Sequence, residues 1–255
     1  DIFRLRLAWS GAIDDPGAEI VVGRLEPEAS WQVELAENST SWELKASTPN
    51  GLSLTIGKYP MLLTLRRGHQ LLFQESAGLS HNGTATFQRI AGQEGQLFYG
   101  GGMQNGRFMH RGHVIGIDRS YNWDEGGSPN AAPVYMSSAG YGVFRCTWAG
   151  GAYDFRGEPT LLAHREQRFD AFYFAAPPRD YKGLLEAYTF ITGRPFMPPI
   201  YALGLGDSDC YHNSRHNNET RVVNSVADGY VENHMPAAWL LVNDGYGCGY
   251  GSGDT

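Results

Sequence analysis

The sequence predicts a mainly β protein, an antiparallel β-sandwich followed by a short strand–helix–strand unit. Over residues 1–175, apolar and polar side chains alternate with a period of two, and turn residues separate the runs about every ten residues. The chain also has 33 glycines among 255 residues and only 18% charged residues, which is typical of a turn-rich fold rather than a helical bundle. With 42% hydrophobic residues, it can bury a large core.

The N-terminal strands are indicated by alternating runs with short turns between them. Residues 3–9 place apolar side chains on one face only. The same rhythm returns at 31–35, 42–46, 52–56 and 61–65, and an apolar run follows at 71–73. Asn50 and Gly51 lie between two of these runs, and Asn-Gly in that position is the strongest short-range signal of a β-hairpin.

A helix and a proline-rich junction follow the strand-like run at 169–175. The helix is indicated by an apolar stripe at positions i, i+3, i+4, i+7 and i+10, formed by Tyr181, Leu184, Leu185, Tyr188 and Ile191. Asp180 is a suitable N-cap, and Gly193 followed by Pro195 is a suitable stop. We therefore expect a sandwich domain over 1–175 and a connecting segment over 176–199, with its helix at about 180–192.

The last part of the chain predicts a parallel strand–helix–strand unit. Apolar runs at 200–205 and 237–242 are expected to be buried strands, and Val222, Val226 and Tyr230 have helical spacing between them. Strands joined in this way form a right-handed parallel pair. Such a pair leaves open edges, and no third strand follows before Thr255, so we expect 200–255 to be an incomplete part of a larger domain.

Composition argues against several classes of protein. A net charge of -7 without clustered Lys and Arg argues against a nucleic-acid partner. The run at 237–242 is among the longest apolar runs and is far shorter than the ~20 residues of a membrane span. The three cysteines form no C-x-x-C pair, so we expect buried structural thiols, with one disulfide left open, at Cys146, Cys210 and Cys248. Sequons at Asn38, Asn82 and Asn218 slightly favour secretion or a periplasmic location.

Two separated segments carry a resemblance to a known family. The junction at 192–204, TGRPFMPPIYALG, resembles the passage from the N-terminal sandwich of glycoside hydrolase family 31 into its catalytic barrel. Upstream, YNWD at 121–124 and the strands at 134–144 resemble the sandwich loop that reaches toward that family's active site, and FYGGG at 98–102 resembles the strand before the loop. Residues 1–97 match only in strand rhythm.

The resemblance implies a retaining α-glycosidase or transglycosylase with a mutarotase-like sandwich and a (β/α)8 TIM barrel. Its chemistry uses two carboxyl groups roughly 5 Å apart, which the family takes from later barrel strands. A barrel takes ~250 residues, whereas 200–255 are the only positions after the junction. We therefore expect the catalytic carboxylates outside this chain, the remainder of the barrel as its partner, an α-linked oligosaccharide or polysaccharide as substrate, and no cofactor.

Asp124 is the substrate-binding residue that the resemblance indicates most directly, because the family's sandwich loop holds an Asp against the bound sugar. Trp123 beside it can stack on a pyranose face, or it can belong to the sandwich core. For Tyr121 we favour the core.

Three further carboxylates follow the two apolar runs of the expected barrel strands. They are Asp207, Asp209 and Asp244. Barrel active sites lie at the carboxyl ends of the strands, where a carboxylate accepts hydrogen bonds from sugar hydroxyls. The alternative is a helix N-cap or a turn former. Asp244 can match either member of the acidic pair that the family carries after its second strand.

Weaker patterns and other functions stay open. His212 and His216 have the spacing of a helical metal pair but no third ligand, so we expect no metal site. The glycine-rich run at 245–251 lacks the Lys-Ser/Thr ending of a phosphate loop, and Asp207-x-Asp209 alone is too common a pattern to indicate a glycosyltransferase. A non-catalytic carbohydrate-binding sandwich is the main alternative function, and an assembly domain without a ligand is a third.

Overall fold

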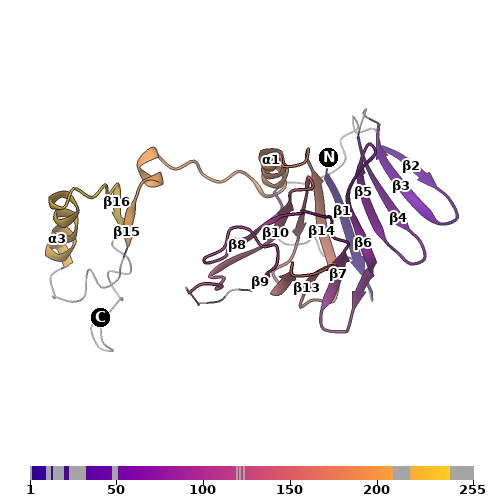
Figure 1. The fold of residues 1–255 in the computed structure, drawn as a ribbon, viewed down its shortest axis with the longest axis horizontal. Helices are drawn as coiled ribbons and strands as arrows, with labels where there is room; N and C mark the ends of the chain where they lie inside the picture. The colour runs from indigo at the N-terminus through magenta and orange to yellow at the C-terminus, as the bar shows by residue number, and fades with distance from the viewer. Residues whose placement is uncertain are drawn as a thin grey trace. The chain divides into compact units, whose positions relative to one another are not determined.

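The computed structural model describes residues 2–9, 13, 20–22, 33–47, 51–118, 120, 122, 124–208 and 219–241. The chain divides into two compact units, Asp1–Arg194 and Pro195–Thr255. Figure 1 shows the ribbon and labels most of the helices and strands.

The first unit is an antiparallel β-sandwich, as the sequence predicts. In spatial order, the five-stranded sheet consists of β1 (Ile2–Ala8), β14 (Arg168–Ala175), β11 (Tyr141–Arg145), β10 (Asn130–Ser137) and β8 (Phe98–Met103). The nine-stranded sheet consists of β2 (Val33–Glu37), β3 (Ser41–Ala46), β4 (Leu52–Gly57), β5 (Leu63–Arg67), β6 (Gln70–His81), β7 (Thr86–Ile90), β13 (Thr160–His164), β12 (Gly151–Asp154) and β9 (Val114–Ile117). The predicted hairpin around Gly51 is confirmed by the antiparallel pairing of β3 with β4.

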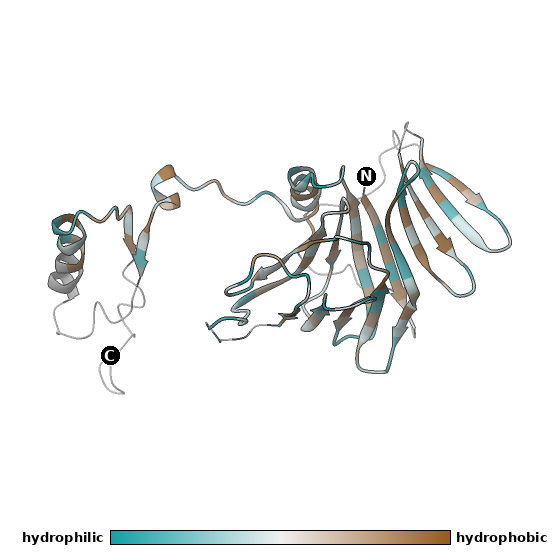
Figure 2. Ribbon diagram, viewed as in Figure 1, coloured by the Kyte–Doolittle hydropathy of each residue, from teal (hydrophilic) through white to brown (hydrophobic). Residues whose placement is uncertain are grey.

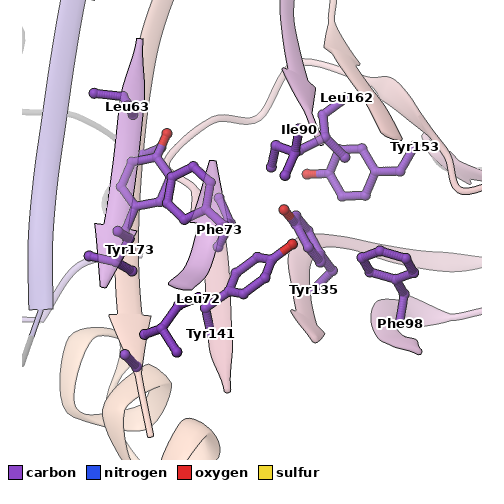
Figure 3. Packing of buried hydrophobic residues seen from close by; sticks show 14 of the residues in the cluster. Leu63, Leu72, Phe73, Ile90, Phe98, Tyr135, Tyr141, Tyr153, Leu162 and Tyr173 are labelled. Atoms are coloured by element: carbon purple, nitrogen blue, oxygen red, sulfur yellow. The ribbon is translucent and has the colours of Figure 1, made fainter. Parts of the chain in front are cut away.

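The core between the sheets is rich in aromatic side chains (Figure 3). The rings of Phe73 and Tyr173 stack with centroids 5.3 Å apart, one from each sheet. Tyr135 meets the rings of Tyr141 and Tyr153 edge-on. Hydrophobic and hydrophilic residues alternate along many of the strands (Figure 2), and the inward faces of these strands supply the core, whereas β2 is exposed along its whole length.

A carboxyl group lies inside this core. Glu75 is 1% exposed; its Oε2 accepts a hydrogen bond from the Leu63 backbone N–H at 2.9 Å, and its Oε1 accepts one from Gln88 Nε2 at 2.7 Å. The same Gln88 nitrogen lies 2.8 Å from the Tyr173 hydroxyl. Burial raises the pKa of Glu75 to about 7, although both hydrogen bonds act against that rise.

Helix α1 (Tyr181–Thr192) covers the other face of the five-stranded sheet. Leu184 and Ile191 are buried in a second apolar cluster that includes Phe144, Phe172 and Phe174 of the sheet. As predicted, the Asp180 side chain caps the helix by accepting from the Gly183 backbone N–H at 3.0 Å. Strand β14 is therefore buried on both faces, because the sandwich core lies on one side and α1 on the other.

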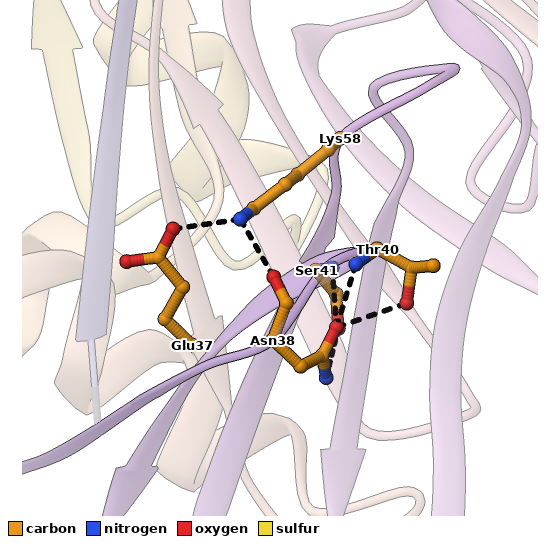
Figure 4. A network of polar contacts seen from close by, with 5 residues as sticks. All are labelled: Glu37, Asn38, Thr40, Ser41 and Lys58. Atoms are coloured by element: carbon orange, nitrogen blue, oxygen red, sulfur yellow. Dashed lines mark hydrogen bonds and ion pairs between the residues drawn. The ribbon is translucent and has the colours of Figure 1, made fainter.

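Two of the sequons form turns between neighbouring strands. Asn38 Oδ1 accepts hydrogen bonds from the backbone N–H groups of Thr40 and Ser41 in the β2–β3 turn, both at 2.8 Å (Figure 4). Asn82 makes the same pattern with Thr84 and Ala85 in the β6–β7 turn. These turns explain why asparagine is present there independently of any glycan.

The second unit contains a parallel strand pair and a helix. Strand β15 (Gly206–Ser208) pairs parallel with β16 (Trp239–Leu241), and α3 (Glu219–Glu232) lies between them in sequence, so the expected strand–helix–strand order is confirmed. Among the described residues, no helix is long and apolar enough to cross a membrane. That the unit begins a TIM barrel stays a prediction.

The predicted strand at 200–205 is wrong. Ile200–Leu203 forms a 3-10 helix (η1), and the strand begins at Gly206. A strand of a parallel sheet is normally buried on both faces. Ile200 and Leu203 are instead 88% and 72% exposed, so this apolar run is not buried in that way. Pairing starts at Gly206, where a Cβ would lie 1.9 Å from the Trp239 ring.

Candidate functional site

The candidate site is the loop between β9 and β10, which carries Asp124. At its base, Ser128 Oγ donates to the Asp118 carbonyl at 2.8 Å and the Ser120 backbone N–H donates to the Ser128 carbonyl at 3.1 Å. These bonds close the loop where it leaves the sheet, so the loop tip begins from a fixed position.

The backbone of Asp124 is held on both sides. Its N–H donates to Asn122 Oδ1 at 2.9 Å, and its carbonyl accepts from the Gly127 N–H at 3.0 Å. The turn closes tightly on Gly127, where a Cβ would lie 2.0 Å from the Asn122 carbonyl oxygen. The Asp124 side chain is exposed, so its carboxylate is presented from a constrained backbone.

A second loop, residues 104–113 between β8 and β9, braces the first. The Asn105 N–H donates to the Gly127 carbonyl at 2.9 Å, and the Gly126 N–H donates to the Asn105 carbonyl at 3.0 Å. Glu125 packs over Gly106, which has a φ of 74°. This backbone pairing fixes the two loops to each other, and sequence spacing alone gives no sign of it.

The structure explains why β8, the strand that leads into the second loop, is rich in glycine. Gly102 has a φ of 77°, and a Cβ there would lie 2.3 Å from the Asn130 carbonyl oxygen. The register between β8 and β10 shifts between Ala131 and Tyr135. The backbones of β8 and β10 therefore approach so closely that a larger residue cannot replace Gly102 without displacing one of them.

An exposed aromatic residue beside the loops was not singled out from the sequence. Phe108 is 83% exposed, and its ring packs on Tyr99 with centroids 5.6 Å apart. Tyr99 in turn contacts Tyr181 of α1 edge-on. In the sequence, Phe108 stands among turn residues and belongs to no apolar strand or helix pattern. This isolation is the feature of the sequence that could have indicated an exposed aromatic side chain.

Of the other predicted site residues, the structure describes only Asp207. Asp207 lies within β15 rather than after it, is half-buried, and accepts a hydrogen bond from the Tyr230 hydroxyl of α3 at 2.9 Å. That hydrogen bond raises the pKa of Tyr230. Trp123, Asp209 and Asp244 lie outside the described residues, so their roles stay predictions.

The structure describes only some of the residues on which the metal and cysteine predictions depend. Within the described ranges, no group of His, Cys, Asp and Glu residues is arranged to hold a metal ion. The pair His212 and His216 and the glycine-rich run at 245–251 lie outside those ranges. Cys146 is buried, as expected, while the other two cysteines lie outside the described residues.

Comparison with known proteins gives a family for the first unit. A model described as the glycosyl hydrolase 31 N-terminal galactose mutarotase-like domain matches residues 1–154. An alpha-xylosidase of Emericella nidulans is 28% identical over 147 residues, which is 56% of this chain and 18% of that protein. Alpha-glucosidase 2 of Bacillus thermoamyloliquefaciens is 28% identical over 172 residues, which is 62% of this chain and 20% of that protein. The chain thus spans about a fifth of the length of these relatives.

Solved structures with the same fold extend the comparison. A GH31 dextranase mutant of Flavobacterium johnsoniae, complexed with isomaltotriose, has a TM-score of 0.75 at 19% identity, covering 96% of this chain and 30% of the dextranase. A cycloalternan-forming enzyme of Listeria monocytogenes has a TM-score of 0.71 at 17% identity, covering 98% of this chain and 24% of the enzyme. At these identities the likeness shows the fold.

Proposed function

The chain belongs to glycoside hydrolase family 31, and from this membership we propose that it is the N-terminal part of an α-glycosidase that hydrolyses or transfers α-linked glycosyl units. The observation that carries the proposal is the family match over residues 1–154, which includes the loop with Asp124. The substrate would be an oligosaccharide or polysaccharide. The relatives named as an alpha-xylosidase and an alpha-glucosidase, and the dextranase with bound isomaltotriose, support this class.

In the proposed mechanism, two carboxyl groups act on opposite sides of the glycosidic bond with retention of configuration. One attacks the anomeric carbon to form a glycosyl-enzyme, and the other protonates the leaving oxygen and then activates water or an acceptor hydroxyl. We propose that both groups lie in a part of the barrel beyond this chain. The chain itself would complete the sugar-binding site.

The proposed task of Asp124 is to bind sugar hydroxyls. A carboxylate accepts hydrogen bonds from hydroxyl groups more strongly than a neutral acceptor does. Because both backbone groups of Asp124 are already hydrogen-bonded, little backbone ordering would be required when a sugar binds. Trp123, Asp207, Asp209 and Asp244 are proposed as further contacts, with one Asp207 oxygen already bonded to Tyr230.

The test compares this chain with a polypeptide that continues through the rest of the barrel. Both are assayed with aryl α-glucosides, α-xylosides and α-galactosides, and the anomer formed first is identified by NMR. We expect hydrolysis or transfer with retention from the longer polypeptide alone. Hydrolysis at an enzymatic rate by this chain alone would refute the placement of the carboxylates, and an inverted product would refute the mechanism.

A second candidate is a non-catalytic carbohydrate-binding sandwich. It is favoured by the division of the chain, since Asp1–Arg194 is a compact unit with its own core. Calorimetry with α-linked oligosaccharides separates the two functions. Binding that persists in a chain ending at Arg194, together with no hydrolysis by the longer polypeptide, would favour the module.

A further inference from the structure

The turn between β6 and β7 contains an asparagine followed by a glycine. The sequence has Asn-Gly at 50–51, 82–83 and 105–106. The second of these lies at the tip of the β6–β7 hairpin, where residues 81–84 are all exposed. In an Asn-Gly pair the glycine backbone nitrogen can attack the asparagine side-chain carbonyl, because glycine has no Cβ to obstruct the approach. Whether a folded chain promotes or prevents this attack depends on the groups around the two reacting atoms.

His81 places a basic nitrogen on the attacking group. The Gly83 backbone N–H donates to His81 Nδ1 at 3.2 Å. Because Nδ1 accepts this hydrogen bond, it carries no proton of its own and is free to take one. The ring of Trp9 packs on the His81 ring with centroids 4.7 Å apart, which restricts rotation of the imidazole. His81 is therefore positioned as a general base for the Gly83 amide proton.

The carbonyl group that would be attacked accepts several hydrogen bonds. Asn82 Oδ1 accepts from the Thr84 hydroxyl at 2.9 Å, from the Thr84 N–H at 3.1 Å and from the Ala85 N–H at 2.9 Å. These donors stabilise the negative charge that develops on Oδ1 when a nitrogen attacks Cγ. Among the described residues, no hydrogen-bond partner holds Asn82 Nδ2, so this nitrogen is free to leave.

The pair Asn105 and Gly106 provides a contrast within the same chain. The Asn105 backbone is hydrogen-bonded to Gly126 and Gly127 of the neighbouring loop, and Glu125 packs over Gly106. In the part of the chain that the structure describes, no hydrogen bond reaches the Asn105 side-chain oxygen or the Gly106 N–H. Attack there would lack both the base and the donors, and it would disturb the backbone pairing of Asn105.

We propose that Asn82 is a site of self-catalysed deamidation, in which His81 acts as the base and the donors of the β6–β7 turn activate the carbonyl. Gly83 N forms a bond to Asn82 Cγ, and the Cγ–Nδ2 bond breaks. The proton removed from the Gly83 N–H leaves with Nδ2 as ammonia, and the product is a cyclic imide. Water then adds across one of the two imide C–N bonds and gives aspartate or isoaspartate, so the reaction needs no oxidant, reductant or cofactor.

Either product changes the turn. Aspartate adds a negative charge at position 82, and isoaspartate also lengthens the main chain by a methylene group. In the unmodified turn the Asn82 N–H donates to the Ala85 carbonyl at 3.1 Å, and Gln167 Nε2 donates to the Gly83 carbonyl at 2.8 Å. A longer main chain displaces these groups from their partners, so we expect isoaspartate to open the end of the hairpin. This modification is independent of the proposed enzymatic function.

The experiment follows the purified full chain during incubation at neutral pH, with and without urea. Peptides from a mildly acidic digest are quantified by mass spectrometry, and isoaspartate is detected by enzymatic methylation. We expect Asn82 to convert about tenfold faster than Asn105 in the folded chain, because only Asn82 has a positioned base. Urea should slow the reaction at Asn82 and accelerate it at Asn105, because unfolding removes the assisting groups from the first and the backbone pairing from the second.

Variants separate the contributions of the base and the donors. His81→Phe keeps an aromatic ring and removes the base, so the rate at Asn82 should fall about tenfold. His81→Gln keeps an acceptor for the Gly83 N–H without a basic nitrogen and should be equally slow. Thr84→Val removes one donor to Oδ1 and should slow the reaction about threefold. The matched control His69→Phe changes an exposed histidine in the β5–β6 turn and should leave the rate unchanged.

Three results would overturn the proposal. They are a faster reaction of Asn82 in urea than in the folded chain, equal rates at Asn82 and Asn105 in the folded chain, and an unchanged rate in His81→Phe. Far-UV circular dichroism checks that the variants are folded, and the comparison of the two sites in the parent chain requires no variant. The melting temperature of the parent should fall as isoaspartate accumulates, whereas that of Asn82→Gln should stay constant; a constant value in the converted parent would refute the opening of the hairpin.

Discussion

Replacing Glu75 by glutamine should remove a pH dependence that is built into the sandwich core. The carboxyl group is 1% exposed, and its pKa is raised from 4.5 to about 7 by burial. In the unfolded chain it returns to its usual value. The folded state therefore holds a proton on Glu75 more tightly than the unfolded state does.

The sign and size of the effect follow from proton linkage. Between pH 4.5 and pH 7 the folded state keeps the proton and the unfolded state loses it, so this group makes stability fall as pH rises. At 1.36 kcal/mol for each pH unit, the contribution lost is about 3 kcal/mol. Below pH 4.5 the contribution is fully present, and above pH 7 the loss is complete.

Glutamine keeps the shape of the side chain without its charge. Its oxygen can still accept from the Leu63 N–H, and its new NH2 group needs an acceptor where Gln88 now donates. Gln88 Oε1 has no hydrogen-bond partner in the structure, so rotation of that amide would supply the acceptor. We therefore expect the replacement itself to cost less than the removed pH dependence.

Urea unfolding from pH 4.5 to pH 8 measures the effect, with far-UV circular dichroism as the signal. The free energy of unfolding of the parent minus that of Glu75→Gln should decrease by about 3 kcal/mol across this range. The matched control Glu186→Gln changes an exposed carboxylate on α1 and should track the parent. A difference that stays constant with pH, or that increases with pH, would refute the reasoning.

Three further predictions concern the scaffold and the loop. Asp180→Ala should lower the free energy of unfolding in urea by about 1 kcal/mol, because it removes the cap on the Gly183 N–H, and an unchanged midpoint would contradict that role. Gly102→Ala should cost about 2–4 kcal/mol from its positive φ and its clash with β10, whereas Gly112→Ala, with a similar φ and open space, should cost about 1–2 kcal/mol. Asp124→Asn should raise KM of the longer polypeptide about tenfold, through loss of a charge-assisted hydrogen bond, with no change in melting temperature; an unchanged KM would exclude Asp124 from sugar binding.

Much of the sandwich could be predicted because its information is local. Alternation in β1 and β3 to β5 follows from each strand having one face on the core, and the ends of α1 follow from Asp180 and Gly193. The prediction of a buried strand at 200–205 is wrong because a continuous apolar run is buried only where other elements pack against it. The run itself can be seen in the sequence, but the elements that would pack against it come from elsewhere in the fold.

The candidate site was less predictable because non-local contacts build it. Asn105 pairs with Gly127 across 22 positions of sequence, and no periodicity signals such a contact. The sequence predicts that Asp207 follows a strand at 200–205, whereas the strand begins at Gly206 and contains Asp207. The hydrogen bonds that join Thr147 to Glu166 and Ala149 to His164 also depend on register between strands, which side-chain patterns alone do not determine.

The two hydrogen bonds on the backbone of Asp124 have an evolutionary consequence. Since Asn122 and Gly127 hold the backbone of the loop there, the side chain at position 124 contributes little to the conformation of the loop. In the proposed sugar site, a single codon change at this position would alter which hydroxyl pattern is recognised while the loop keeps its path. Under the proposed function, preference for one sugar over another would therefore diverge among descendants without first requiring compensating changes in the sandwich.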